Sequence, residues 1–251
     1  MAILEEMMAK INLERRAEIG REKRARTKAQ LIAAAKALFS RGPWEAVTVD
    51  EVVNEAGVAK GTFYGHFNDL SQLAAAVADE LIQSFDEFIQ PQRLTISDPL
   101  VRVAFGCDAF IAKALEDRSW ASLVARMARS HPAVGQGARS RLSEDVREAL
   151  KQSPQAGFSL ELGLEVALGI VLQVAAAVGD GRLEERDRAA AVRSILAALG
   201  ASKQDAESIV SRLGGVRRTA AQSASREGEG PLEERLRDPA IPLKRPNAKR
   251  A

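Results

Sequence analysis

The sequence predicts an all-α fold, with an N-terminal three-helix domain of helix-turn-helix form and a larger helical domain after it. Hydrophobic residues make up 46% of the chain but aromatic residues only 4%, so alanine, leucine and valine must build the core. Strand-forming residues do not alternate in runs, whereas the helix formers Ala, Leu, Glu and Arg are abundant. The length of 251 residues corresponds to one large domain or two small ones.

Several classes of protein are excluded by residues that the chain lacks. The single cysteine, Cys107, cannot form an intramolecular disulfide, and together with two histidines it is too little for a zinc site. We therefore expect no metal or other cofactor, and we expect Cys107 to be a small buried hydrophobe. The N-terminus carries charges where a signal peptide is apolar, and the longest uncharged apolar run, Val166–Gly179, is shorter than a membrane span. These features predict a cytoplasmic protein with no membrane partner.

The formal charge of +2 is unevenly distributed along the chain. Residues 1–28 hold eight Lys and Arg against five acids, and residues 215–251 hold nine against five. Between these ends, residues 41–70 hold two bases against five acids, and residues 71–214 hold 16 against 19. Both ends are basic and the middle is mildly acidic, so a total near zero is compatible with a nucleic-acid partner.

Capping residues and helix breakers divide the first 90 residues into four predicted helices. Thr27 is the expected N-cap of the first helix. Thr48 and Glu51 have the spacing of a capping box at the start of the second. Pro91 is expected to break the fourth, which is the longest. The predicted helices cover residues 28–41, 49–56, 59–67 and 69–90, with Gly42 and Gly57 after the first two and Asn68 or Asp69 before the last.

The same signals predict further helices in the rest of the chain. Asp98 followed by Pro99 is an N-cap with proline at the first helical position. Ser119 and Ser159 are the expected N-caps of two later helices, the second of which is the most apolar. Beyond Val216 the composition predicts a disordered tail. The predicted helices cover residues 99–115, 120–130, 138–152, 160–178, 183–199 and 202–213, with a turn over residues 153–157.

Residues 48–67, TVDEVVNEAGVAKGTFYGHF, carry the most informative pattern. Two short helices join at Gly57, because a left-handed backbone suits the turn of a helix-turn-helix motif. Gly61 and Gly65 each cost a helix about 1 kcal/mol relative to alanine, and close approach to a DNA backbone would explain both. The side chains expected to pack the two helices are Val52, Ala56, Val58 and Phe63, which leaves Lys60, Gly61, Thr62, Tyr64 and His66 available to a groove.

Over residues 25–85 the sequence resembles the TetR (tetracycline repressor) family of bacterial transcription regulators. The resemblance rests on the string AGVAKGTFYGHF at residues 56–67, on the threonine-capped helix before it, and on Phe39 and Leu73. In such an interface, phosphate contacts position the protein and base contacts specify the sequence. The resemblance implies phosphate contacts from Thr48, Tyr64 and His66, and contacts to base edges or nearby phosphates from Lys60 and Thr62, with Gly61 close to the backbone.

Two departures from the family pattern affect the expected DNA contacts. Val53 stands where the family often has alanine, and we expect it to widen the contact between the helices slightly. Leu70 stands where many members carry lysine, which removes one phosphate contact. We expect a flexible basic arm, residues 1–24, and the bases next to it to compensate, with Arg24 and Arg26 among the DNA-binding residues.

The resemblance assigns the DNA-binding domain to residues 25–85 and implies an effector-binding and dimerisation domain over residues 86–214, before the basic tail 215–251. The helices near residues 160–178 and 183–199 look like the pair that forms a four-helix dimer interface in relatives. Large apolar side chains at helical spacing are the candidates for lining an effector pocket. These candidates are Phe85, Phe88, Phe105, Phe110, Trp120 and Met127.

The expected function is sequence-specific DNA binding by a homodimer that regulates transcription, as a repressor released from a palindromic operator by a small-molecule effector. A transcription activator of the same fold is one alternative, because the sign of regulation depends on operator position. A helical small-molecule enzyme and a non-specific DNA-binding protein are two others. We expect no enzymatic activity, because no nucleophile–base pair, paired carboxylates or phosphate loop is visible, and a non-specific binder would show no sequence preference.

Overall fold

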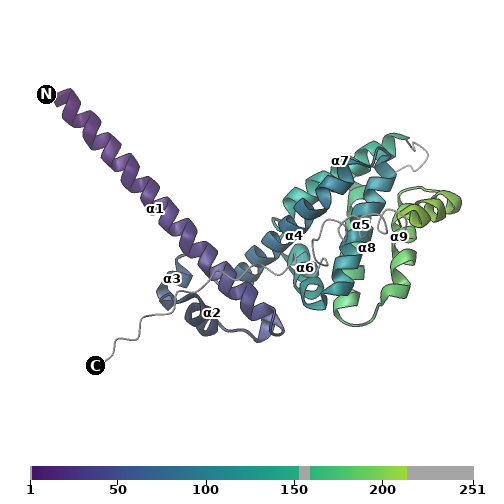
Figure 1. Ribbon diagram of the computed structural model, residues 1–251, viewed down its shortest axis with the longest axis horizontal. Coiled ribbons are helices and arrows are strands. Elements are labelled where there is room, and N and C mark those ends of the chain that lie inside the picture. The colour runs from purple at the N-terminus through teal and green to yellow at the C-terminus, as the bar shows by residue number, and fades with distance from the viewer. Residues whose placement is uncertain (1, 153–158, 214–251) are drawn as a thin grey trace, which may run out of the picture.

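A computed structural model describes residues 2–152 and 159–213, and every regular element within them is helical, which confirms the all-α prediction (Figure 1). Helices α1 to α3 lie together at one end, α5 to α9 form a larger bundle at the other, and α4 connects the two parts. The predicted turn over residues 153–157 and the predicted disordered tail lie outside the described residues. The helices are α1 (Ala2–Phe39), the short 3-10 helix η1 (Trp44–Ala46), α2 (Val49–Ala56), α3 (Lys60–Tyr64), α4 (Leu70–Leu94), α5 (Pro99–Glu116), α6 (Arg118–Ser130), α7 (Gln136–Gln152), α8 (Leu160–Gly179) and α9 (Glu185–Ala198), followed by a helical stretch over residues 203–213.

Helix α1 is much longer than the sequence analysis predicts. Thr27 does not cap it, because the helix begins near the start of the chain and the Thr27 hydroxyl donates to the Lys23 carbonyl oxygen, 3.0 Å away, inside the helix. A threonine hydroxyl can bond to the carbonyl four residues earlier as well as cap a helix, so the residue type alone did not decide between these roles. Residues 2–24, which lie in the arm predicted over residues 1–24, continue the helix without interruption.

The helix-turn-helix forms where its local signals predict. Thr48 accepts a hydrogen bond from the backbone N–H of Glu51, and the Glu51 carboxylate accepts one from the backbone N–H of Thr48 at 2.7 Å, so the capping box is complete. Gly57 adopts a left-handed backbone with φ 66° and turns the chain between α2 and α3. Val52 and Phe63 are fully buried in the contact between the two helices, which fixes the face that α3 turns outward.

Helix α4 begins at the predicted cap but continues past the predicted break. Asp69 caps it with its side chain. Pro91 lies inside the helix near its end, where its missing N–H removes one helical hydrogen bond. Arg93, two residues later, is held in a buried ion pair with Asp145 at 2.7 Å, and this contact stabilises the last turn. The helix also crosses residue 85, so the two predicted domains share it.

The other helix starts follow the capping rules. Asp98 caps α5 with Pro99 in its first turn, and Ser159 caps α8, both as predicted. The cap of α6 is Asp117 rather than the predicted Ser119, because the Asp117 carboxylate accepts from the backbone N–H of Trp120 at 2.9 Å. A carboxylate is favoured at this position by the partial positive charge of the helix N-terminus.

Two clusters of buried side chains hold these helices together. The first contains side chains of α1 to α3, the first half of α4, α6 and the end of α8. The second contains side chains of α5, α8, α9 and the helical residues 203–213. The first cluster therefore runs without a gap from the helix-turn-helix into the larger bundle, and a shift of α4 or α6 would be transmitted to α2 and α3.

Helix α8 lies within the larger bundle but turns one face outward. It is long and apolar enough to cross a membrane by length and composition, although it carries Glu161 and Glu165. It packs against α5, α6, α7 and α9, and 39% of its most apolar 18-residue window is buried. Its outward stripe repeats at helical spacing and contains the exposed Leu162, Gly169 and Gln173 and the half-buried Val166 and Ile170.

Candidate DNA-binding surface and effector cavity

The outward face of α3 gathers the side chains that the sequence predicts to contact DNA. Phe63 points inward, is fully buried, and meets the Tyr64 ring edge-on at a centroid distance of 5.3 Å. Tyr64 itself is 53% exposed. The face also presents Lys60 and Gly61, which are exposed, and Thr62 and His66, which are half-buried.

Lys60 is held by an acidic neighbour that the sequence analysis did not anticipate. Its Nζ lies 2.8 Å from Oδ1 of Asp50 and donates to Oδ2 at 3.1 Å. The hydrogen bond to Asp50 raises the pKa of Lys60. Both side chains are exposed, so the pair is weak, and a phosphate or a guanine acceptor can take the place of the carboxylate.

The Thr48 hydroxyl already has two partners in the free protein. It donates to Oε2 of Glu51 at 2.8 Å and accepts from the backbone N–H of Glu51 at 3.3 Å. The hydrogen bonds from the Thr48 side chain and backbone lower the pKa of Glu51. A phosphate oxygen can accept the hydroxyl proton in place of Glu51 while the hydroxyl oxygen continues to cap α2.

Helix α1 places two bases against the end of α3. Arg24 donates from Nη2 to the Gly65 carbonyl oxygen at 3.0 Å, and Nζ of Lys28 lies 5.9 Å from the centroid of the Phe67 ring. Burial, and then the charges of Arg24 and Lys28, lowers the pKa of His66. The structure thus brings Arg24 and His66 together at one edge of the α3 surface.

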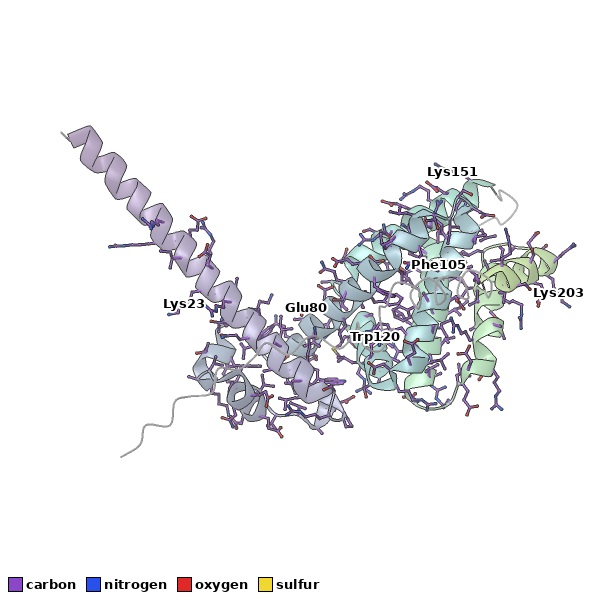
Figure 2. The ribbon with its side chains drawn as sticks, in the orientation of Figure 1. Lys23, Glu80, Phe105, Trp120, Lys151 and Lys203 are labelled. Atoms are coloured by element: carbon purple, nitrogen blue, oxygen red, sulfur yellow. The ribbon has the colours of Figure 1, made fainter. Side chains whose placement is uncertain are left out.

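Arg26 is not part of this cluster. Residues two apart on a helix point in different directions, so Arg26 is exposed on another side of α1 from Arg24. Lys23, labelled in Figure 2, lies on α1 close to the three-helix body. The exposed bases of α1 among residues 15–28 are Arg15, Arg16, Arg21, Lys23, Arg24, Arg26 and Lys28, and the acids there are Glu18 and Glu22.

Gly61 is not required by the internal packing of the fold. A Cβ added there would meet no neighbouring group within 4 Å, whereas at Gly65 it would lie 3.3 Å from the Thr62 carbonyl oxygen. Alanine would favour the helix by about 1 kcal/mol at such a position. Packing within the described structure therefore does not require a glycine at position 61, and this position is exposed on the outward face of α3.

The larger bundle contains a cavity of about 580 Å³ between α4, α5, α6, α7 and α8. Two of the side chains predicted to line an effector pocket do line it: Phe85 from α4 and Phe110 from α5, whose rings meet edge-on with centroids 5.6 Å apart. Ile82, Val171 and other aliphatic side chains extend this apolar wall. A volume of this size is typical of small-molecule sites.

The other four predicted side chains do not line this cavity. Phe105 and Met127 are buried in the two core clusters, and Phe88 packs against the second of them. Trp120, labelled in Figure 2, packs against Phe110, with 4.9 Å between the two ring centroids. It lines a second cavity of about 500 Å³. Core residues and pocket-lining residues recur at the same helical spacing, so the sequence alone could not distinguish one kind from the other.

Part of the cavity lining is charged, and sequence reasoning missed it. Arg93 and Arg102 both donate to Asp145, at 2.8 Å each, and Arg141 donates from Nε to Asp86 at 2.5 Å. Both carboxylates are buried. The partners lie 43 to 55 residues apart in the chain, so no local spacing could have revealed them.

The segment between α6 and α7 joins the cavity to the part of α4 nearest the helix-turn-helix. Gly135, which lines the cavity, donates its N–H to Oδ1 of Asp79 at 2.8 Å. Nε2 of His131 lies 3.1 Å from the Ser71 hydroxyl in the first turn of α4. A change in the cavity can therefore reach α4 through the hydrogen bond from Gly135 to Asp79 and through the contact between His131 and Ser71.

An N-terminal helix-turn-helix on a larger all-helical body defines a helix-turn-helix regulatory protein. Residues 31–77 match the family described as bacterial regulatory proteins, tetR family. Residues 31–77 therefore match the DNA-binding domain of the TetR family, which confirms the predicted resemblance over that stretch.

Solved structures share the fold over 68% to 76% of the chain. RolR in complex with the ligand resorcinol superposes with a TM-score of 0.64 at 24% identity, over 76% of this chain and 96% of RolR. The transcriptional regulator FadR from Bacillus subtilis, in complex with stearoyl-CoA, gives 0.52 at 18% identity over 68% of this chain and 96% of FadR. The fatty acid degradation regulator FadR from Bacillus halodurans gives 0.51 at 20% identity over 68% and 93% of the two chains. No curated protein matches the sequence significantly.

Proposed function

We propose that this protein is a sequence-specific DNA-binding transcription regulator that acts as a dimer in the cytoplasm and is released from its operator by a small molecule. Residues 25–85 are the DNA-binding part and residues 86–214 the effector-binding and dimerisation part. The observation that carries the proposal is the exposed face of α3, which presents Lys60 and Tyr64 beside a complete helix-turn-helix. This arrangement suits a helix that enters a major groove.

The proposed DNA contacts fall into phosphate contacts and base contacts, according to the hydrogen-bond donors of each side chain. Thr48, Tyr64 and His66 bind phosphates, and Lys60, once it leaves Asp50, donates to guanine O6 or N7. Thr62 contacts the same region, and Gly61 lets the backbone approach the duplex. Arg24 and Arg26 bind phosphates on two sides of α1.

The bases of α1 supply the electrostatic attraction that the motif lacks. Residues 41–70 are acidic by two bases against five acids, whereas residues 15–28 carry seven bases against two acids. Because α1 is one continuous helix, these charges keep a fixed direction relative to α3 rather than sampling the solvent freely. The arm therefore contacts phosphates that flank the half-site read by α3.

The dimer forms through α8 and α9. The outward stripe of α8 includes Leu162, which is 48% exposed, and Ile170, which is half-buried. On α9 the exposed positions Ala190, Ser194 and Ala197 follow one another at helical spacing and are all small, so a partner helix can approach closely. Two copies related by a two-fold axis would bury both stripes in a four-helix interface and present two reading heads to a palindromic operator.

The effector binds in the cavity and acts on α4. RolR was solved with resorcinol and the Bacillus subtilis FadR with stearoyl-CoA, so proteins of this fold hold small molecules. Here α4 lines the cavity with Phe85 and carries the helix-turn-helix at its other end. A ligand that binds more tightly when the two reading heads are misplaced shifts the population away from the DNA-binding form.

The proposal is tested by binding of the purified protein to an operator selected from genomic fragments. Tyr64→Ala and Lys60→Ala should each abolish specific binding while the dimer remains intact, because both remove contacts at the duplex and neither side chain is in the core. Lys203→Ala changes an exposed base of the larger bundle and should leave binding unchanged. Undiminished operator affinity in both α3 variants would refute the assignment.

A further inference from the structure

We propose that the cavity takes an uncharged small molecule with an apolar ring-shaped body and a hydroxyl group that donates to Asp86. The inference rests on the proposed function, because it names the chemical class of the effector. It is carried by three features of the cavity: an acceptor atom that lacks a donor, a set of charges that already neutralise one another, and an aromatic wall.

Asp86 supplies the acceptor. This residue lines the cavity from α4 and is only 6% exposed. Nε and Nη2 of Arg141 both meet the same carboxylate atom, Oδ2. No group in the described part of the chain donates to the other oxygen, Oδ1. Among the described residues, Trp44 Nε1 is the buried side-chain atom without a hydrogen-bond partner, so Oδ1 of Asp86 is open to the cavity and can accept from the O–H group of a ligand in place of water.

The carboxylates of the cavity wall are already neutralised by arginines. Arg141 pairs with Asp86, Arg93 and Arg102 share Asp145, and Arg102 also pairs with Glu148 beyond the wall. A charged ligand would lose its hydration and would have to separate one of these pairs to gain a counter-ion. A neutral hydroxyl can donate to Asp86 without disturbing any of them.

Arg139 and Glu165, which also line the cavity, pair with each other, and this leaves Arg129 as the guanidinium of the lining without a carboxylate partner. Arg129 does not favour an anion strongly. Arg129 donates to the Ala125 carbonyl oxygen at 3.1 Å and to Oε1 of Gln173 at 2.8 Å, both of which are neutral groups. The side chain is exposed, so water already screens its charge. An anionic group at Arg129 would gain little, and it would lack a proton to donate to Asp86.

The aromatic wall selects the body of the ligand. Phe85 and Phe110 meet edge-on, and Leu168 and Leu172 continue the surface from α8. Ring edges and faces of this kind pack well against another aromatic ring. A ring that lies against this wall can direct its hydroxyl toward Asp86, which lines the same cavity.

Four probes with one shared ring system test the class by calorimetry on the full chain without DNA: naphthalene, 2-naphthol, 2-naphthoate and 2-naphthylmethylammonium. 2-Naphthol should bind at least about tenfold more tightly than naphthalene, as a hydrogen bond to a charged group allows. Neither ion should bind more tightly than naphthalene. Binding of either ion as tight as that of 2-naphthol, or 2-naphthol no better than naphthalene, would overturn the proposal.

Substitutions at Asp86 and at Arg141 should change the order of probe affinities, the first in favour of the anion and the second in favour of the cation. Asp86→Asn should weaken 2-naphthol by about tenfold and strengthen 2-naphthoate, because Arg141 then lacks a counter-ion. Arg141→Gln should instead strengthen the binding of 2-naphthylmethylammonium. This variant provides the test if Asp86→Asn does not fold. Asp180→Asn, an exposed change outside the cavity, should leave all four affinities unchanged. If a folded Asp86→Asn or Arg141→Gln variant ranks the four probe affinities in the same order as the unaltered protein, the proposal is overturned.

The two proposals fail separately. A protein that binds its operator but ranks the probes differently contradicts the ligand class and leaves the DNA-binding function standing. A protein that ranks the probes as expected but binds no DNA contradicts the proposed function instead.

Discussion

The bases of α1 should set how steeply DNA binding depends on salt. Residues 15–28 carry seven exposed bases against two glutamates on a helix that continues into the three-helix body. The triple variant Arg21→Gln, Lys23→Gln and Arg26→Gln removes three of these charges. Glutamine is also a good helix former, so α1 should remain helical, and Arg24 keeps its hydrogen bond to Gly65.

Each phosphate contact contributes about 0.9 to the slope of log affinity against log salt concentration. Three lost contacts per protomer therefore reduce the slope by up to about 2.7 per protomer and about 5.4 per dimer. Fluorescence anisotropy of a labelled operator between about 50 and 200 mM salt measures the slope. A matched variant with Arg147→Gln, Arg186→Gln and Lys203→Gln loses the same charge from exposed positions of the larger bundle and should keep the original slope. Equal slopes for the arm variant and the unaltered protein would refute the role of α1.

Three further predictions each concern one side chain. Asp50→Asn frees Lys60 from its ion pair, so operator affinity should rise by about two- to fivefold in anisotropy assays, and a fall would contradict the proposed base contact. The pKa of His66 is lowered in the free protein by burial and by two bases of α1, whereas a phosphate would raise it. Operator binding should therefore take up a proton and strengthen as the pH falls from about 8 to about 6, and His66→Gln should remove that dependence. Ile170→Glu puts a charge on the outward stripe of α8 and should give a monomer by light scattering, whereas Gln204→Glu at an exposed position should not.

Local chemistry explains which parts of the fold the sequence predicts. The Thr48 capping box, the left-handed Gly57 and the Asp98 cap depend on residues within a few positions of one another, and all three form as predicted. The same rules fail where one residue has two uses. Thr27 bonds backward inside a helix instead of capping one, and Pro91 is tolerated because a distant ion pair holds the turn that contains it.

The candidate sites divide in the same way. The α3 surface is predictable because its residues are consecutive and their faces follow from helical spacing. The polar wall of the cavity is not, because Asp86 meets Arg141 and Asp145 meets Arg93 only when α4 and α7 pack together. The Asp50–Lys60 pair is intermediate: its partners are ten residues apart, and they meet only across the turn of the motif.

The central claim is that α2 and α3 read a specific DNA sequence as a symmetric pair. Selection of bound fragments from sheared genomic DNA by the purified full chain, followed by sequencing, tests it most directly. The account predicts enrichment of a palindrome whose half-sites lie about one helical turn of DNA apart or a multiple of it, and no enrichment with Tyr64→Ala. Uniform recovery of fragments by the unaltered protein, or the same palindrome recovered by the variant, would contradict it.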